Sequence, residues 1–332
     1  MERNKQHLLL VRFSALGDIL MTVPVIRSLS RQYPDLKITV VSRPYVGSIF
    51  ERLSGNIHFV GINPRNYSGL FGLYRLFKEV KSLSPTHYCD LHDVLRTKFL
   101  TFMFRLTGIP TSHIVKDLKA RKAFIESEVK SQQETSFERY AKAINALFPF
   151  SLDPHALGQP AGKVKIEAKE MRIGIAPFAA HKGKIYPLDK TEQVVRILSS
   201  RVRDIYLFGA GESEKSLMEQ WDARYGNVHS MVGQLSNMAA EMNLIEQLDL
   251  MLTMDSGNMH LASLTSTPVY SIWGATHPLG GFLGWNQPMD RCIQKDLACR
   301  PCSIFGNKPC KFGNYPCLDI SPEEVAERLL RQ

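Results

Sequence analysis

The sequence contains no apolar run approaching the roughly 18 residues that a membrane-spanning helix needs. Six cysteines are few for 332 residues, which excludes a small disulfide-stabilised scaffold. The apolar run at residues 8–11 is short and ends at Arg12, so it does not resemble a signal peptide. There is also no low-complexity tract. We therefore expect a globular cytoplasmic protein.

The composition, with 44% apolar and 22% charged residues, is that of an ordinary globular chain. Its length exceeds what one hydrophobic core usually supports, which predicts two domains of roughly 150 residues. The formal net charge is +9, and it is unevenly distributed. Residues 1–150 hold 22 Lys and Arg against 12 Asp and Glu, whereas residues 151–332 hold 19 and 20. The first half is therefore predicted to face an anionic partner, unless the clustering is due to chance.

Strand-like runs alternate with helical patterns along both halves of the chain. Strands are predicted at 8–13, 37–42, 57–62, 87–91, 171–176, 204–208, 250–253 and 268–272. Helices are predicted at 18–32, 69–82, 95–107, 136–147, 188–200, 213–225, 238–246, 259–263 and 322–330. This alternation indicates parallel sheets.

The predicted fold class is therefore α/β, with two Rossmann-like doubly wound domains facing a central cleft. The domains are assigned to residues 1–155 and 170–320, because residues 149–170 carry Pro, Gly and Lys with little periodic apolar content. The remaining segment, 321–332, is expected to be a helix that packs back on the N-terminal domain.

Ser14, Gly17 and Asp18 lie where the first predicted strand turns into a helix. Ligands of open α/β sheets bind at such carboxyl ends of strands, and Gly17 permits close backbone approach. Asp18 is either a helix cap or a functional carboxylate. The turn lacks the G-x-G-x-x-G spacing, so a dinucleotide site is not indicated.

Three strand-to-helix turns in the second half resemble phosphate and sugar sites. Ser256, Gly257 and Asn258 could offer backbone amides to a phosphate, with Asp255 suited to sugar hydroxyls, although the same residue types cap helices. A second turn carries Lys182 with Lys184, which suit a diphosphate or are simply solvated lysines. The third turn begins at Gly209, and its Glu212 or Glu214 could bind ribose hydroxyls or only favour the helix N-terminus.

Several segments together resemble glycosyltransferase family 9, the ADP-heptose:lipopolysaccharide heptosyltransferases, across essentially the whole chain. They are residues 8–20 with Pro24, 233–235, 255–262 (DSGNMHLA) and 274–278. The resemblance implies a GT-B fold and an inverting, metal-independent transfer that uses no cofactor. The implied donor is ADP-heptose, and the implied acceptor is the phosphorylated Kdo/heptose inner core of lipopolysaccharide.

The resemblance also implies roles for individual residues. Asp18 becomes the catalytic base, Lys184 contacts the donor phosphate and Asp255 holds donor sugar hydroxyls. The residues implied on the donor side also include Ser256, Gly257, Asn258, Glu214 and Gly209. Ala179 and Ala180 depart from the family pattern, which often has Thr or Ser there.

On the acceptor side the resemblance implies Ser14, Gly17, Arg96 and Lys98, with surface charges on a helix as the alternative for the last two. The basic segment at residues 116–122 is expected to attract the anionic inner leaflet of the membrane. The partners expected are thus an ADP-sugar, a phosphorylated lipid A core and a membrane surface on which the protein is peripheral. No nucleic acid is expected, and the oligomeric state is left open.

The carboxyl-terminal cysteines leave a further possibility. Cys299, Cys302, Cys310 and Cys317 have a spacing suggestive of zinc ligands, with free or buried thiols as the alternative. Two other functions are therefore retained: a family member using another nucleotide sugar or cell-surface glycan, and a non-catalytic zinc-containing nucleic-acid-binding protein.

Overall fold

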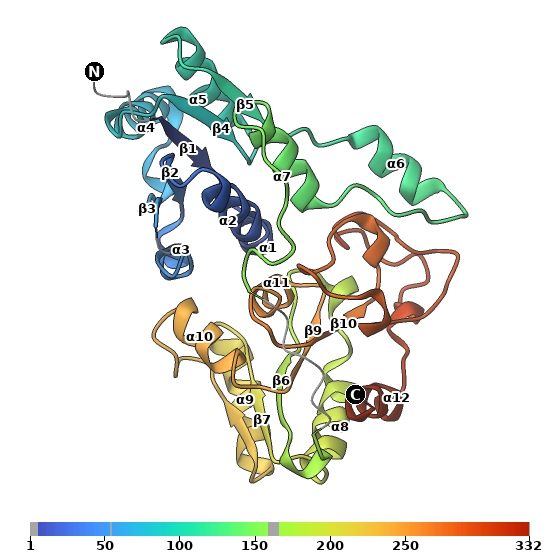
Figure 1. Cartoon of the computed structure of the whole chain (residues 1–332). Helices are drawn as coiled ribbons and strands as arrows, with labels where there is room; N and C mark the ends of the chain where they lie inside the picture. Colours follow the sequence, from blue (N-terminus) through green and yellow to red (C-terminus); the bar gives the residue numbers. More distant parts are fainter. Residues whose placement is uncertain (1–5, 54, 159–165, 332) are drawn as a thin grey trace. The chain divides into compact units, whose positions relative to one another are not determined.

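The computed structural model describes residues 6–53, 55–158 and 166–331 and separates the chain into two compact units (Figure 1). Part of the predicted connection, residues 159–165, lies outside the described residues. Unit 1 comprises Met1–Lys116, Ser136–Leu157 and Asn237–Ala239. Unit 2 comprises Asp117–Thr135, Gly158–Ser236 and Ala240–Gln332.

Unit 1 is built on a five-stranded parallel sheet in the order β3-β2-β1-β4-β5. Its strands are β1 (His7–Val11), β2 (Lys37–Ser42), β3 (Ile57–Gly61), β4 (His87–Asp90) and β5 (Thr111–His113). β1 is buried along its whole length, as expected for a central strand covered on both faces.

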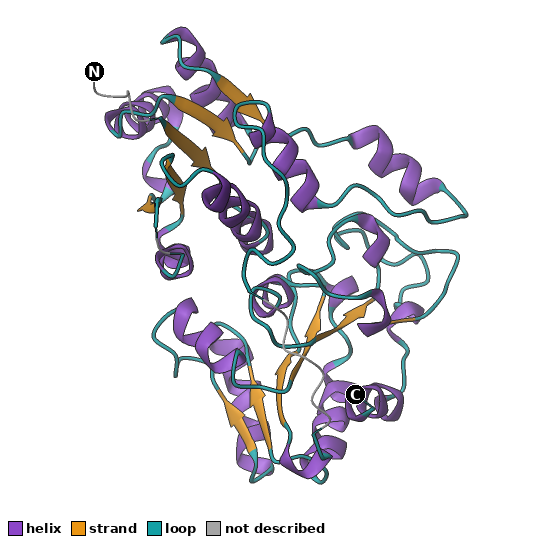
Figure 2. Cartoon of the chain, viewed as in Figure 1, coloured by secondary structure: helices purple, strands orange, loops and turns teal. Residues whose placement is uncertain are grey.

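Helices cover both faces of this sheet (Figure 2). They are α1 (Leu16–Leu20), α2 (Thr22–Gln32), α3 (Gly47–Glu51), α4 (Gly69–Ser82), α5 (Leu95–Leu106) and α7 (Ser136–Asn145). α2 packs against α7, whereas α4 packs against α5. Right-handed crossovers in both directions from β1 place these two pairs on opposite faces. The doubly wound prediction is confirmed for this unit.

The helix predicted to begin at Asp18 begins earlier, at Leu16, and is interrupted at Met21. Pro24 is the third residue of α2, within the first turn, where a missing N–H does not need a partner. The interruption of the predicted 18–32 helix therefore lies three residues before this proline.

Unit 2 contains a six-stranded parallel sheet in the order β11-β10-β9-β6-β7-β8. Its strands are β6 (Arg172–Ala176), β7 (Asp204–Leu207), β8 (Val228–Ser230), β9 (Leu250–Met254), β10 (Val269–Trp273) and β11 (Cys292–Gln294). Its main helices are α8 (Leu188–Ser199), α9 (Glu212–Arg224), α11 (Gly257–Ala262) and α12 (Pro322–Leu330). α10 (Met238–Ile245) begins in residues grouped with unit 1. α12 packs against α8, and its contact with the N-terminal unit stays a prediction.

A segment from the first half of the sequence belongs to unit 2. It contains α6 (Leu118–Glu126), whose Phe124 ring lies 6.1 Å from the ring of His277. Farther along, the backbone N–H of Gln133 donates to the carbonyl of Leu279 at 2.9 Å. The chain therefore enters unit 2, returns to unit 1 for α7, and then enters unit 2 again.

Among the helices of the described residues, none is both long and apolar enough to cross a membrane. In both units the sequence-predicted site residues follow the carboxyl ends of central strands: β1 and β4 in unit 1, and β6, β7 and β9 in unit 2. The sheet topology thus determines which side chains come together.

Candidate functional site

In unit 1 the turn after β1 places Asp18 on the first turn of α1. Asp18 is the third helical residue, and Ala15 occupies the N-cap position, so Asp18 is not the N-cap of this helix. Its carboxylate is about one-quarter exposed. Asp18 therefore combines a fixed backbone position with access to solvent.

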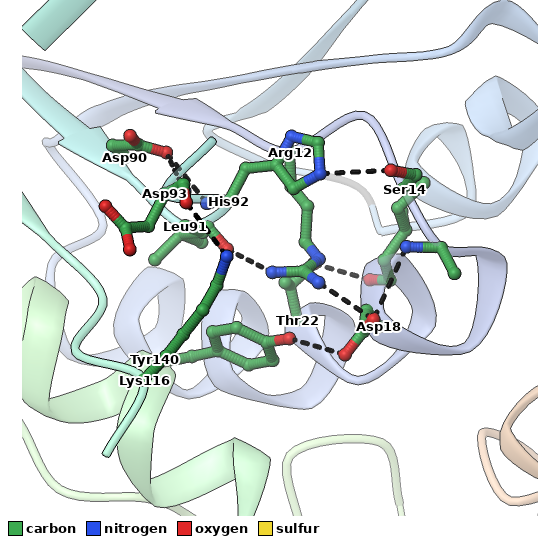
Figure 3. A network of polar contacts seen from close by, with 12 residues as sticks. Arg12, Ser14, Asp18, Thr22, Asp90, Leu91, His92, Asp93, Lys116 and Tyr140 are labelled. Atoms are coloured by element: carbon green, nitrogen blue, oxygen red, sulfur yellow. Dashed lines mark hydrogen bonds and ion pairs between the residues drawn. The ribbon is translucent and has the colours of Figure 1, made fainter. Parts of the chain in front are cut away.

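Three donors hold the Asp18 carboxylate (Figure 3). Arg12 Nη2 lies 2.9 Å from Oδ2, and the backbone N–H of Ala15 donates to the same oxygen at 3.4 Å. The hydroxyl of Tyr140, on α7, donates to Oδ1 at 3.2 Å. Arg12 itself is buried, lies 5.3 Å from the Tyr140 ring centroid and donates to the carbonyl of Leu91. The carboxylate is therefore oriented by two elements far apart in sequence.

Ser14 forms a pair with His92, which follows β4. Ser14 Oγ lies 3.0 Å from His92 Nε2, and Nδ1 of the same ring has no hydrogen-bond partner among the described residues. Burial and the positive charges of Arg12, Lys116 and Arg96 lower the pKa of His92 to about 4, whereas the charge of Asp18 raises it. His92 is therefore uncharged near neutral pH.

The loop carrying His92 is fixed by a buried carboxylate. Asp90 Oδ1 accepts the backbone N–H groups of His92 at 2.8 Å and Asp93 at 2.9 Å. Burial raises the pKa of Asp90, which is completely inaccessible to solvent. Lys116 Nζ adds a bond of 2.9 Å to the carbonyl of Asp93. Asp90 thus acts as the structural anchor of this loop.

The two predicted acceptor cations begin α5 but have different surroundings. Lys98 is largely exposed, and its Nζ lies 3.3 Å from Asp93 Oδ1. Arg96 is half-buried and close enough to His92 for its charge to lower the pKa of that imidazole. The structure therefore brings Ser14, Gly17, Asp18 and Arg96 to one edge of the sheet, with Lys98 engaged in an ion pair beside them.

In unit 2 the predicted donor residues Lys184 and Asp255 are joined. Lys184 Nζ lies 3.0 Å from Asp255 Oδ2, and both side chains are at least 85% buried. The same oxygen accepts the hydroxyl of Thr276 at 2.8 Å. The cation predicted to bind phosphate and the carboxylate predicted to bind sugar hydroxyls thus form one buried cluster.

Close backbone packing fixes the loops that carry this cluster. The backbone N–H of Ala275 donates to the carbonyl of Gly183 at 2.7 Å. A Cβ on Gly274 would lie 2.4 Å from that carbonyl oxygen, and one on Gly306 would lie 2.7 Å from Cγ of Lys184. Glycine is therefore required at both positions by the close approach of the loops.

The guanidinium of Arg300 is buried beneath these loops, and no carboxylate of the described residues forms an ion pair with it. It donates to the carbonyls of Gly274 at 2.6 Å, Thr276 at 2.8 Å and Trp273 at 3.0 Å. It also donates to the carbonyl of Lys295. Arg300 therefore ties the segment after β10 to the cysteine-containing segment from which it comes.

The remaining predicted donor residues follow the ends of β9 and β7, the two strands that flank β6. Ser256 is the N-cap of α11, but its hydroxyl is buried and makes no hydrogen bond within the described part of the chain. Gly257 and Asn258 form the first turn of α11 and are half-buried. After β7, Glu214 Oε2 accepts the backbone N–H of Ala210 at 2.8 Å, against Gly209. Glu214 thus supports its own loop, whereas Ser256 keeps an unused hydroxyl.

The cysteine segment does not form a preorganised zinc site. Among the described residues, no three His, Cys, Asp or Glu side chains are arranged to hold a metal ion. Cys302 Sγ instead approaches the carbonyl of Cys299 at 3.7 Å, and Cys310 Sγ accepts the backbone N–H of Phe312 at 3.4 Å. Burial raises the pKa of Cys317 to about 11, which keeps this thiol protonated. All four are free cysteines in this structure.

Sequence reasoning missed several residues that the structure brings to these two sites. They are Arg12, His92 and Tyr140 around Asp18, and Thr276 and Arg300 around Asp255. The positions of Arg12, directly after β1, and of Thr276, within the quoted segment 274–278, could have drawn attention to them. Nothing local in sequence identifies Tyr140.

The solved structures that resemble this chain define its fold class. The E. coli heptosyltransferase WaaC with ADP has a TM-score of 0.68 and 14% identity, covering 98% of this chain and 99% of that one. The glycosyltransferase family 9 protein from Veillonella parvula DSM 2008 has a TM-score of 0.72 and 15% identity, covering 99% and 97%. Two Rossmann-like units, each with a parallel sheet, give the GT-B fold, as predicted.

Sequence comparison then gives the family. Residues 66–315 match the model of glycosyltransferase family 9 (heptosyltransferase), and the chain belongs to this family. Lipooligosaccharide heptosyltransferase 2 of Haemophilus influenzae is 23% identical over 355 residues, covering 97% of this chain and 98% of that protein. The Campylobacter jejuni protein of the same name is 30% identical over 133 residues, and this match spans only 40% of its length.

Proposed function

We propose that this protein is an inverting, metal-independent heptosyltransferase, which moves heptose from ADP-heptose to the phosphorylated Kdo/heptose inner core of lipopolysaccharide. The observation that carries the proposal is the Asp18 carboxylate, partly exposed and held by Arg12, Ala15 and Tyr140 at the carboxyl end of β1. The relatives from H. influenzae and C. jejuni support it, because both are named as lipooligosaccharide heptosyltransferases.

The hydrogen bonds of Asp18 indicate which oxygen acts as the base. Oδ2 accepts from both Arg12 and Ala15, which uses its two lone pairs. Oδ1 accepts only from Tyr140 among the described residues and retains one lone pair. An acceptor hydroxyl would transfer its proton to Oδ1 as its oxygen bonds to the anomeric carbon and the bond from that carbon to the ADP oxygen breaks.

The second unit supplies what the leaving group requires. ADP leaves with additional negative charge, and stabilisation of that charge by fixed cations is a major source of catalysis. Lys184 is held in place by Asp255 before any ligand arrives. When the donor binds, its phosphate oxygens would replace Asp255 as the partner of Lys184. Asp255 would then accept hydrogen bonds from the sugar hydroxyls, and Thr276 would donate one to them.

On the acceptor side we assign His92 a positioning role. If Nε2 carries the proton and donates to Ser14 Oγ, only a lone pair on buried Nδ1 is left without a partner, which costs less than an orphaned N–H. Ser14 can then direct its own O–H toward an oxygen of the acceptor. Arg96 lies near this pair and is suited to an acceptor phosphate. This acceptor is lipid-linked, so we propose that the protein works at the inner leaflet as a peripheral protein.

The direct test is transfer from ADP-heptose to a phosphorylated Kdo-lipid acceptor, followed by mass spectrometry of the product. We expect Asp18→Asn to lower kcat by about 10²- to 10⁴-fold, because the substitution removes the base while preserving shape. The matched control is Asp153→Asn, which changes another carboxylate paired with an arginine, Arg31, at 2.7 Å in the same unit.

Asp153→Asn should leave kcat unchanged. The proposal fails if no ADP-sugar supports transfer by the intact protein, or if Asp18→Asn retains full activity.

One departure from the family pattern favours a second candidate within the same chemistry. Ala179 and Ala180 lack the hydroxyls that many members have there, so the donor could be another nucleotide sugar. A ligand that binds the folded state raises its melting temperature by mass action. Greater stabilisation by UDP or GDP than by ADP would favour this alternative.

A further inference from the structure

The outer surface of α4 and α5 exposes an unusual amount of apolar area. Thirteen large apolar side chains are exposed among the described residues, and six of them lie on these two helices of 14 and 12 residues. Their exposed fractions run from 42% to 88%. The six are Leu70, Phe71, Tyr74, Leu95, Phe102 and Leu106. We call this surface the α4–α5 face.

Both helices expose apolar side chains on their outer sides, while their inner sides pack into the core of unit 1. Leu76 and Phe77 of α4 and Leu100 and Phe104 of α5 belong to the core beneath the sheet. The rings of Phe77 and Phe104 meet edge to face, with their centroids 5.2 Å apart, where the two helices pack together. The exposed apolar residues therefore lie on the sides of the two packed helices that face away from this core.

The segment that carries this face is also rich in cations. Residues 65–106 contain seven Lys and Arg but three Asp and Glu, and Asp90 among the latter is completely buried. Lys78 Nζ lies 5.3 Å from the ring centroid of Tyr74, so its stem covers the ring while its charge remains at the surface. Protein–protein interfaces are depleted in lysine, whereas helices that lie in a membrane interface combine Leu and Phe with Lys and Arg.

The charge of the whole chain is concentrated in the same region. Residues 1–116 hold 16 Lys and Arg and 7 Asp and Glu, whereas residues 117–332 hold 25 of each. The basic segment at 116–122 lies mostly in the stretch 117–135, which carries four of each sign and belongs to unit 2. The excess of positive charge is therefore carried by the sheet of unit 1 and its helices, and not by the 117–135 segment. This makes the first region the better candidate for binding an anionic surface.

We propose that the α4–α5 face docks on an anionic lipid bilayer, with its apolar side chains inserted among the headgroups and its cations against lipid phosphates. α4 and α5 run antiparallel to the strands, so their N-terminal ends lie at the sheet edge that carries Asp18. Leu95 follows Asp93 by two residues. A lipid-linked acceptor could thus present its sugar to Asp18 while its acyl chains stay in the bilayer, a use that rests on the proposed function.

Vesicle flotation of the full chain tests the docking without any acceptor. Phosphatidylcholine vesicles are compared with vesicles of phosphatidylcholine and phosphatidylglycerol, neither containing glycolipid. The intact protein should float only with the anionic vesicles. Leu70→Ser/Phe71→Ser and Lys78→Gln/Lys81→Gln should each lower the partition coefficient about tenfold, the first by removing inserted area and the second by removing charge.

Matched controls lie in the 117–135 segment. Leu118→Ser/Val129→Ser removes two comparably exposed apolar side chains, and Lys119→Gln/Lys122→Gln removes two cations. Both should leave flotation unchanged. The proposal is overturned if the intact protein ignores anionic vesicles, if the controls lower binding equally, or if gel filtration shows a dimer that Leu70→Ser/Phe71→Ser dissociates.

A transfer assay separates this proposal from the proposed function. The face variants should keep the activity of the intact protein on a deacylated, water-soluble acceptor and lose it on acceptor embedded in anionic vesicles. Flotation without transfer to either acceptor would reject the enzymatic function but not the docking. Transfer to both acceptors without flotation would reject the docking alone.

Discussion

At the scale of single residues, the first unit combines a carboxylate held by one arginine and two neutral donors with an imidazole kept neutral. The side chains responsible come from β1, the turn after β4, and α7. The motif around Asp18 could be recognised in the sequence because its residues are consecutive. Tyr140 and His92 could not, because only the order of strands in the sheet brings α7 and the loop after β4 against β1.

The neutral state of His92 predicts how stability depends on pH. Its pKa is about 4 in the folded chain and near 6.5 when unfolded. Between these values the unfolded chain binds a proton that the folded chain does not, so stability falls as pH drops from about 6.5 toward 4. The loss from this residue approaches about 3 kcal/mol at pH 4.

Denaturant unfolding of the intact protein and of His92→Gln at several pH values between 4 and 7.5 measures this effect. Gln cannot titrate but retains a donor for Ser14, so the variant should lose less stability on acidification. Equal pH dependence of the two proteins would show that His92 titrates normally.

At the scale of elements, the sequence predicted the long helices and the central strands well. The helix at 69–82 was placed without error, and that at 95–107 ended one residue too late. The sequence did not predict the edge strands β5, β8 and β11. Each has only three residues, which is too short to show a periodic apolar pattern. The helix α6 was not predicted, because its charges suggested a surface segment. Its position in unit 2 depends on contacts with residues distant in sequence, such as His277.

The segment after β10 gives an element-scale prediction. Arg300→Met should lower the stability of unit 2 by about 3 kcal/mol, because several buried carbonyls lose their donor. The same change should weaken ADP binding, because Thr276 would no longer be fixed beside Asp255. Chemical denaturation and calorimetric titration with ADP measure the two effects.

Arg201→Gln is the control, since this arginine forms an exposed pair with Glu327 at 3.0 Å and contributes less than about 1 kcal/mol. If Arg300→Met binds ADP normally despite reduced stability, the buried guanidinium supports the fold and not the donor site.

At the scale of the whole molecule, the net charge is divided unevenly between the two units. Unit 1 carries the entire positive excess spread over its surface, whereas the second unit would neutralise a diphosphate through one buried lysine. Exposed charges are screened by salt far more than buried pairs are.

Raising salt from about 0.1 M to about 1 M shortens the Debye length from roughly 10 Å to 3 Å. We therefore expect the KM for a soluble, phosphorylated acceptor to rise several-fold more than the KM for the ADP-sugar. Steady-state kinetics with each substrate varied in turn measures both constants. Equal relative increases in the KM for acceptor and the KM for the ADP-sugar would show that the charge asymmetry does not serve acceptor binding.

The excursion of residues 117–135 into unit 2 has a consequence for synthesis on the ribosome. Phe124 is buried in the finished protein against His277, and Arg121 of the same helix lies 5.5 Å from the ring centroid of Phe305. At roughly 5 to 20 residues per second, about 10 to 40 s separate the emergence of α6 from that of Phe305. During that interval the nascent chain carries a helix whose apolar side chain, Phe124, has a binding site that has not yet been translated.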